Sequence, residues 1–314
     1  MKAGTNLERI LSAGHFAVTA EAGPPKGTSA RSIQRKGELL RACCDAVNMT
    51  DNQTAIVRMS SLAGSALLKQ QGIEPVMQMV TRDRNRIALQ SDVLGAIALG
   101  IGNILCLTGD HQKFGNHPTA RGVFDMDSIQ LIRVLKTMRD EKKFICGEDI
   151  SGEVPLFIGA AENPFADPFE YRVHRLAKKI KAGADFIQTQ AVYDVEKFAR
   201  WMKEVADRGL DKQVHILAGV IPIRAAGMAR YMRDSVPGVA VPQSVVSRME
   251  AAGKNAKEEG LKIALEIIEQ IRQIPGVHGI HIMAVGWEEI VPDIVSKSGL
   301  MPRPVVAEEI KEGV

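Results

Sequence analysis

Cysteines are few in this sequence, and their spacing excludes the common cysteine-based architectures. The 314 residues include only four, at positions 43, 44, 106 and 146, and no two of them form a C-x-x-C pair. The adjacent Cys43 and Cys44 suit neither a disulfide framework nor a zinc knuckle. We therefore expect reduced cysteines in a cytoplasmic protein, with a metal or redox role for the adjacent pair as the minor alternative.

Aromatic residues and net charge are also scarce. Aromatics make up 4% of the chain, the formal net charge is +3, and no basic run is interleaved with aromatic side chains. These values argue against a platform for stacking bases, and against binding to nucleic acid or to an acidic membrane surface.

No segment predicts a signal peptide or a membrane span. The first eight residues lack the apolar core of a signal peptide. The longest uncharged run, residues 93–109, contains four glycines and Asn103. We interpret it as a helix end, a turn and a strand rather than as a membrane helix.

What the sequence does contain is a repeated unit of a short apolar run, a polar tip and a helical segment. The clearest run, residues 103–110, is uncharged until it stops on Gly109 and Asp110. A fully buried strand has this pattern. Eight runs are predicted to be strands: 16–21, 46–50, 75–80, 103–110, 156–161, 185–190, 214–221 and 278–285.

Helical segments separate these strands, which indicates a parallel sheet. They are expected at 29–44, 60–71, 86–99, 125–139 (or from 127), 168–182, 195–206, 225–233 and 287–298, with an additional helix pair at 244–252 and 255–274. Eight such units over residues 1–314, without a linker, predict one α/β domain, a (β/α)8 TIM barrel. A doubly wound open sheet is the alternative, but no G-x-G-x-x-G follows the first strand.

In such a barrel the carboxyl ends of all strands lie on one face, where an active site is built. Polar residues at six of these ends should therefore converge. Each alone is equally well explained as a helix cap, but together they favour a polar pocket. They are Glu21, Thr50, Gln78, Asp110, Glu162 and Gln190.

Other residue types are missing from these strand ends. No lysine is among them, which disfavours a Schiff-base aldolase. His15 and His215 lie at strand beginnings and His281 lies in mid-strand, which disfavours a metal site, and His111 and His117 in the long Gly-rich loop 111–123 are a weak signal. Carboxylates and amides suit proton transfer, with a bound cofactor doing the harder chemistry.

The segment from residue 168 is markedly basic. Arg172, Arg175 and Lys179 share one helix face by their spacing. This face could bind a phosphate at the barrel mouth or simply be solvated, and spacing alone slightly favours the solvated face.

Several motifs together resemble methylenetetrahydrofolate reductase, in that family's order and over nearly the whole chain. They are Ala20-Glu21 with Pro24-Pro25, Thr50, residues 81–85 (TRDRN), residues 107–110 (LTGD), residues 181–190 (KAGADFIQTQ) and residues 219–222 (GVIP). The resemblance implies a flavin-containing barrel, with FAD or alternatively FMN, that reduces 5,10-methylenetetrahydrofolate to 5-methyltetrahydrofolate.

The same resemblance implies roles for individual residues. Glu21 matches the general acid that protonates N10, for which covering by flavin and folate would raise its pKa. Asp110 matches an aspartate near both pterin and flavin, and Gln190 a folate-binding glutamine. Positions that match flavin contacts are Thr50, Gln78, Thr108, Gly109, Asp110, His111, Arg172, Arg175 and Lys179. The resemblance thus favours the phosphate-binding interpretation of the basic helix, and it implies no metal.

Two departures from the family pattern bear on the electron donor. Gln78 stands where many members have histidine, and residues 224–227 (RAAG) stand where members that use NAD(P)H directly place an aromatic. Together with a chain that ends soon after the barrel, they are typical of a branch that works with an iron–sulfur and zinc partner subunit. We expect an oligomer or hetero-complex, with NAD(P)H or that partner as donor.

Two other functions stay open at this point. A pterin-binding barrel that transfers a methyl group to a corrinoid protein would share the carboxylates and amides but need no flavin. A barrel subunit retained for assembly in a redox complex would be inactive alone.

Overall fold

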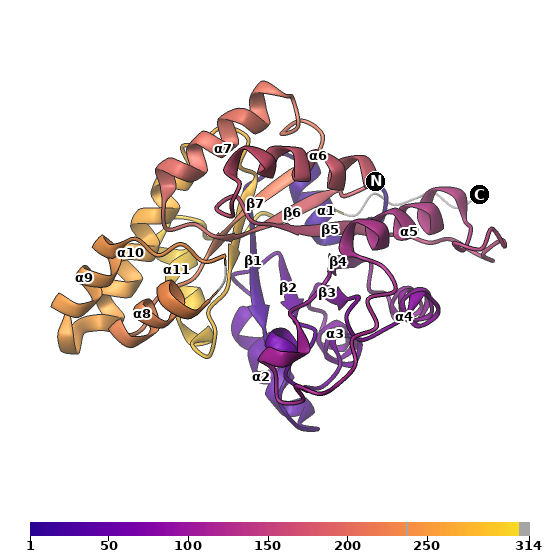
Figure 1. Cartoon of the computed structure of the whole chain (residues 1–314), viewed down its shortest axis with the longest axis horizontal. Coiled ribbons are helices and arrows are strands. Elements are labelled where there is room, and N and C mark those ends of the chain that lie inside the picture. The colour runs from indigo at the N-terminus through magenta and orange to yellow at the C-terminus, as the bar shows by residue number, and fades with distance from the viewer. Residues whose placement is uncertain (237, 308–314) are drawn as a thin grey trace.

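The computed structural model describes residues 1–236 and 238–307, and its centre is a closed barrel of eight parallel strands (Figure 1). Each strand pairs with the next in the chain, and β8 pairs with β1. The predicted (β/α)8 TIM barrel is confirmed. The strands are β1 Ala17–Ala22, β2 Ala46–Met49, β3 Pro75–Val80, β4 Asn103–Leu107, β5 Phe157–Glu162, β6 Phe186–Ala191, β7 His215–Val220 and β8 Gly279–Ile282.

Helices surround the barrel, and the additional pair, α9 and α10, lies between β7 and β8 as predicted. Both contact each other, and α9 contacts α8, so the three form one group beside the barrel (Figure 1). The α-helices that follow strands are α2 Ala30–Leu40, α3 Ser61–Gln70, α4 Arg86–Ala98, α5 Ser128–Glu141, α6 Arg172–Ala182, α7 Val195–Asp207, α8 Ala226–Ser235, α9 Gln243–Ala251, α10 Ala256–Ile271 and α11 Val291–Lys297. Short 3-10 turns are η1 Gln53–Ala55, η2 Gln112–Phe114, η3 Phe169–Tyr171, η4 Gly253–Asn255 and η5 Glu288–Ile290.

Most element boundaries differ from the predicted ones by one or two residues, but several differ by three or four. The helix expected from 287 begins at Val291, the helix expected to reach 274 ends at Ile271, and the strand expected to reach 110 ends at Leu107. The helix expected from 168 begins at Arg172, because Pro168 leads into η3 instead. The helix expected to reach 44 ends at Leu40, whose carbonyl accepts the N–H groups of Cys43 and Cys44 in a turn. The eighth strand ends at Ile282 rather than 285, because Val285 N–H turns back to the carbonyl of Met283.

A short helix that the sequence did not predict, α1 Asn6–Ser12, closes the amino end of the barrel. Its Leu7, Ile10 and Leu11 are buried against the first inward-facing residues of the strands. These strand residues include Ala17, Ala46, Val76, Leu105, Phe157, Phe186 and Leu217. Thr5 caps the helix, and Glu8 accepts hydrogen bonds from the Ala3 and Gly4 N–H groups at 2.8 and 2.7 Å. Within the residues that the structure describes, α1 thus covers the amino end of the barrel and leaves the carboxyl end open.

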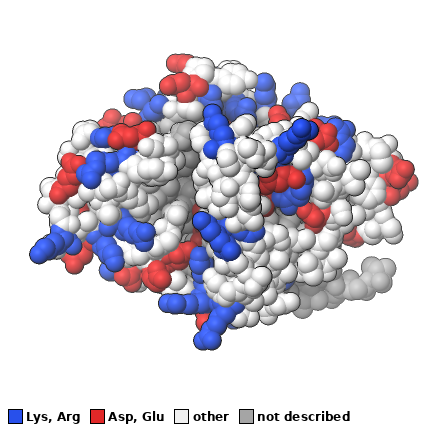
Figure 2. Space-filling model, turned by 60° about the horizontal axis from the view of Figure 1, so that its bottom comes forward, with Lys and Arg blue, Asp and Glu red and all other residues white. Residues whose placement is uncertain are grey.

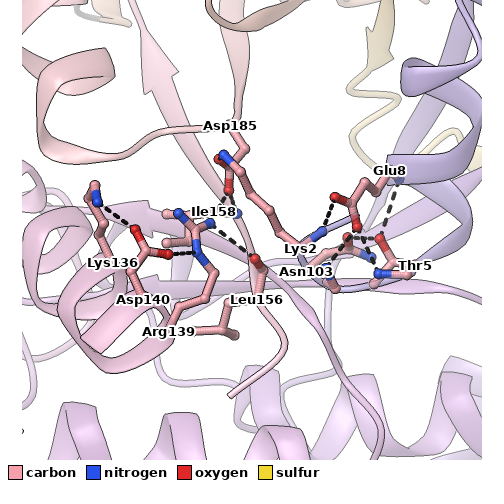
Figure 3. A network of polar contacts seen from close by, with 12 residues as sticks. Lys2, Thr5, Glu8, Asn103, Lys136, Arg139, Asp140, Leu156, Ile158 and Asp185 are labelled. Carbon is pink, nitrogen blue, oxygen red and sulfur yellow. Dashed lines mark hydrogen bonds and ion pairs between the residues drawn. The ribbon is translucent and has the colours of Figure 1, made fainter. Parts of the chain in front are cut away.

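A network of hydrogen bonds and ion pairs connects the segments at the closed amino end of the barrel (Figure 3). The Asp185 carboxylate accepts hydrogen bonds from Arg139 Nη1 at 2.6 Å and from the Ile158 N–H at 2.8 Å, and it pairs with Lys2. Arg139 lies on α5, Ile158 on β5 and Lys2 before α1. Because Arg139 and Asp185 are almost fully buried, each charge needs the other, and the three segments are held together.

Two features of the structure concern binding to nucleic acid and insertion into membranes. On the face in Figure 2, basic and acidic side chains are interspersed rather than gathered by sign. Over residues 1–236 and 238–307, the structure contains no helix with the length and apolarity needed to cross a bilayer.

Shortening one buried side chain of α1 tests whether this helix stabilises the amino end of the barrel. Ile10 is fully buried, so Ile10→Ala should lower the free energy of unfolding by about 2–5 kcal/mol. Ile87 is 75% exposed, so Ile87→Ala is the matched control and should change it by less than about 0.5 kcal/mol. Urea unfolding measures both, and similar losses for the two variants would contradict the assignment.

Candidate active site

Polar side chains lie above the apolar floor of the barrel, in two layers. Residues two apart on one strand share a face, so Thr19 and Glu21 on β1, and Gln188 and Gln190 on β6, point the same way. Thr19 and His281 are paired neighbours across β1 and β8. The lower layer thus contains Thr19, Asn48, Gln188 and His281, and the upper layer contains Glu21, Gln78 and Gln190.

A cavity of about 340 Å³ opens above these layers at the carboxyl ends of the strands. This volume lies within the range of small-molecule sites, about 300–1,000 Å³. Acids and amides line one side of it, and the basic face of α6 lines another. Its polar lining residues are Glu21, Gln78, Thr108, Ser128, Glu162, Asn163, Arg172, Arg175, Lys179, Gln188, Thr189, Gln190 and His281.

In the described part of the chain, Glu21 has one carboxylate oxygen with protein partners and one without a hydrogen-bond donor. Gln78 Nε2 donates to Oε1 at 3.1 Å, and His281 Nε2 lies 3.7 Å from the same oxygen. No hydrogen bond from the described part of the chain reaches Oε2. The side chain is 20% exposed, so Oε2 can exchange a proton with a ligand in the cavity.

His281 is a site residue that the sequence interpretation set aside. The predicted strand ran to 285 and put His281 in the middle, but the strand ends at Ile282, one residue later. The signal that could have found it is the two-residue alternation: polar residues at 19 and 21 and at 188 and 190 point inward, and 281 occupies the matching position on β8.

The basic side of the cavity is less uniform than the spacing on α6 suggests. Lys179 is buried, and its Nζ donates to Glu162 Oε2 at 2.7 Å and to the Ala161 carbonyl at 2.5 Å. Burial lowers the pKa of Lys179, against the opposing effect of the Glu162 charge. Glu162 therefore neutralises this lysine within the protein.

The two arginines are available to a ligand. Arg172 donates only to the carbonyls of Pro168 and Asp167, and no partner holds Arg175 among the residues that the structure describes. Both line the cavity and are partly exposed. Their guanidinium groups are suited to an anionic group such as a phosphate.

Four of the predicted site residues do not line the cavity: Thr50, Gly109, Asp110 and His111. Asp110 is exposed, and its Oδ2 accepts a hydrogen bond from the Thr54 N–H at 3.1 Å. Thr50 is buried and bonded to Gln53. The loops after β2 and β4 thus hold these residues at the side of the barrel mouth.

These two loops are packed tightly against each other. Asn52, Thr54 and Ala55 have φ of 45°, 57° and 54°, in the left-handed region that side chains disfavour. A Cβ on Gly115 would lie 1.8 Å from the Ala55 carbonyl oxygen, so only glycine fits there. Arg82, 2% exposed, donates to the carbonyls of Asn52 and Asp110 and links the loops.

No arrangement of metal ligands accompanies the cavity. Over the described residues, no three or more His, Cys, Asp or Glu side chains are placed to hold a metal ion. The site therefore offers one carboxylate with an oxygen that lacks a protein donor, several amides and two available cations.

The family model of methylenetetrahydrofolate reductase matches residues 6–299 of the chain. The chain belongs to the methylenetetrahydrofolate reductase family. It is 28% identical over 218 residues to methylenetetrahydrofolate reductase 2 of Schizosaccharomyces pombe, covering 65% of this chain and 32% of that protein. It is 23% identical over 234 residues to 5,10-methylenetetrahydrofolate reductase of Salmonella typhimurium, covering 74% and 72%.

The chain thus spans about a third of the fungal methylenetetrahydrofolate reductase and most of the bacterial one. Among solved structures, it is similar to a Clostridium thermocellum protein that binds two copies of 5-methyl-5,6,7,8-tetrahydrofolic acid. The TM-score is 0.64 at 13% identity, covering 95% of this chain and 100% of that one. It also resembles 2,3-dimethylmalate lyase, with a TM-score of 0.51. At these identities the structural likeness shows the fold alone.

The buried pair of Glu162 and Lys179 can be tested by a double-mutant cycle. Glu162→Gln or Lys179→Met alone should lower the free energy of unfolding by about 3–5 kcal/mol, because each leaves a buried charge without its partner. The double variant should lose clearly less than the sum of the two, as measured by urea unfolding.

The exposed pair of Lys203 and Asp207 on α7 is the matched control. Its side chains are 75% and 60% exposed, so Asp207→Asn should change stability by less than about 0.5 kcal/mol. Additive losses for Glu162 and Lys179 would show that the two charges are not coupled.

Proposed function

We propose that this barrel reduces 5,10-methylenetetrahydrofolate to 5-methyltetrahydrofolate with a bound flavin, Glu21 acting as general acid. The observation that carries the proposal is the position of Glu21: Oε1 accepts from Gln78 beside His281, no described residue donates to Oε2, and the side chain lines a cavity of ligand size. Membership of the methylenetetrahydrofolate reductase family supports the reaction. The binding of 5-methyltetrahydrofolate by the similar C. thermocellum protein supports a folate in a barrel of this shape.

The residues of the cavity fit a flavin with a phosphate. Arg175 is a cation without a protein partner among the described residues, and Arg172 adjoins it, so the pair would hold the phosphate of FAD or FMN. Gln78 and Thr108 would contact the ring, whereas Thr50, Gly109, Asp110 and His111 would reach it only if the loops after β2 and β4 moved toward the cavity. When bound, the flavin supplies the hydride.

The chain's own residues supply binding and the proton. Glu21 would hold a proton at Oε2 and deliver it to N10 of the folate, while the covering ligand removes water from a carboxyl that is already mostly buried. Gln190 Oε1 accepts the Ala191 N–H at 3.0 Å, which leaves its Nε2 hydrogens for the pterin. Asp110 would reach the pterin once its bond from Thr54 opens.

We extend the proposal to the electron donor. Arg224, which follows Pro222, donates to the Gly286 carbonyl at 2.7 Å and so joins the loops after β7 and β8 at the barrel mouth. The sequence has no aromatic there to hold nicotinamide. Electrons would therefore come through an iron–sulfur and zinc partner subunit in a cytoplasmic hetero-complex, and NADH alone should reduce the flavin poorly.

A pterin-binding methyltransferase is the second candidate, because the similar C. thermocellum protein binds 5-methyl-5,6,7,8-tetrahydrofolic acid, a methylated folate. The absorbance spectrum of the isolated protein separates the two. A flavin spectrum, with FAD or FMN released on denaturation, supports the reductase, and a colourless protein that binds 5-methyltetrahydrofolate supports the methyltransferase.

Replacing the proposed acid tests the reductase directly. In the flavin-loaded protein with its electron donor, Glu21→Gln should lower methylenetetrahydrofolate reduction by about 10²–10⁴-fold, because no carboxyl remains to protonate N10. The flavin spectrum should be unchanged. Glu196 is exposed on α7, so Glu196→Gln is the control and should retain full activity. An undiminished rate in Glu21→Gln would contradict its role as the acid, and in the complex with the partner subunit it would favour a barrel kept for assembly.

A further inference from the structure

A hydrogen-bonded network of buried polar side chains lies beneath Glu21, inside the barrel. Thr19 and Asn48 are fully buried, and Gln188 and His281 are each 3% exposed. They come from β1, β2, β6 and β8, so four strands contribute to one connected set. A polar group at this depth is costly unless it is hydrogen-bonded, and the donors and acceptors can be counted.

The two amides form a reciprocal pair. Asn48 Nδ2 donates to Gln188 Oε1 at 2.7 Å, and Gln188 Nε2 donates to Asn48 Oδ1 at 3.0 Å. Gln188 Nε2 also donates to Thr19 Oγ1 at 3.2 Å. The Thr19 oxygen is therefore an acceptor toward Gln188, and its own hydrogen is free for another partner.

The hydroxyl hydrogen of Thr19 determines which tautomer His281 adopts. Its candidate acceptors are His281 Nδ1 at 2.9 Å and the Ile280 carbonyl at 3.4 Å, and the shorter contact is the stronger. If Thr19 donates to Nδ1, a neutral His281 must carry its hydrogen on Nε2. Nε2 is the atom that faces Glu21 Oε1 at 3.7 Å.

The opposite arrangement is disfavoured by Glu21. If both amides were reversed, Thr19 would donate to Gln188 and accept a hydrogen from Nδ1. Nε2 would then present a lone pair to the Glu21 carboxylate, two acceptors facing each other. With Nε2–H the same contact is attractive.

We propose that Thr19, supported by Asn48 and Gln188, is a positioning residue that fixes the Nε2–H tautomer of His281 and thereby stabilises Glu21 as a carboxylate. When Glu21 gives its proton to the folate, the charge that forms on it meets the Nε2 hydrogen. The distance of 3.7 Å between the two atoms has to shorten when the ligand binds for this hydrogen bond to form. No covalent bond to His281 forms or breaks.

The tautomer can be observed without any reaction. In protein labelled with ¹⁵N-histidine, ¹H–¹⁵N spectra of the imidazole nitrogens at pH about 8 should show His281 with hydrogen on Nε2 only. His281→Gln assigns the signal. Thr19→Ser keeps the hydroxyl group and should give the same spectrum as the wild type. Thr19→Val removes the hydroxyl group and should give a mixture of the two tautomers. A wild-type spectrum with hydrogen on Nδ1, or no change in Thr19→Val, would overturn the proposal.

The effect on proton delivery rests on the proposed function and has its own measurement. Thr19→Val should lower kcat for methylenetetrahydrofolate reduction by about 10-fold, the scale of one hydrogen bond, with KM for the folate changed less than about twofold. Thr19→Ser should stay within about twofold. A changed spectrum with unchanged kcat would refute the link to Glu21. A wild-type protein without reductase activity would refute the proposed function and leave the tautomer result standing.

Discussion

The pairing of β1 with β8 is the contact on which the rest of this molecule depends. It closes the sheet and places Thr19 beside His281, 262 positions apart in the chain. Glu21 stands two residues beyond Thr19 on the same face, so it meets His281 and, across β2, Gln78. In an open sheet the first and last strands would lie at opposite edges, and this group of side chains would not exist.

The two ends of the barrel differ in the side chains that fill them. At the amino end, α1 fills the interior with apolar side chains, and Asp185 joins three segments through buried hydrogen bonds. At the carboxyl end, amides and acids replace the apolar lining and a cavity remains. The closed end can supply the stability that the polar end gives up, because burying polar groups contributes less than burying apolar ones.

The sequence predicted the strands well because both of their faces are buried, so each appears as an uncharged run. β3 begins and ends where expected, and β4 begins where expected. It failed at α1, where seven residues are too few to show a helical period. It also could not place Asp110, whose direction depends on a hydrogen bond from Thr54 in another loop with left-handed backbone. Long-range contacts of this kind leave no local pattern.

The ion pair between Glu162 and Lys179 has a consequence for how the cavity attracts an anion. It removes the one lysine of the α6 face from contact with ligands and leaves that task to arginines. Arginine stays charged at any pH that a cell reaches, whereas a buried lysine can lose its proton. The positive charge that the α6 face offers to an anionic ligand therefore does not change with pH over that range.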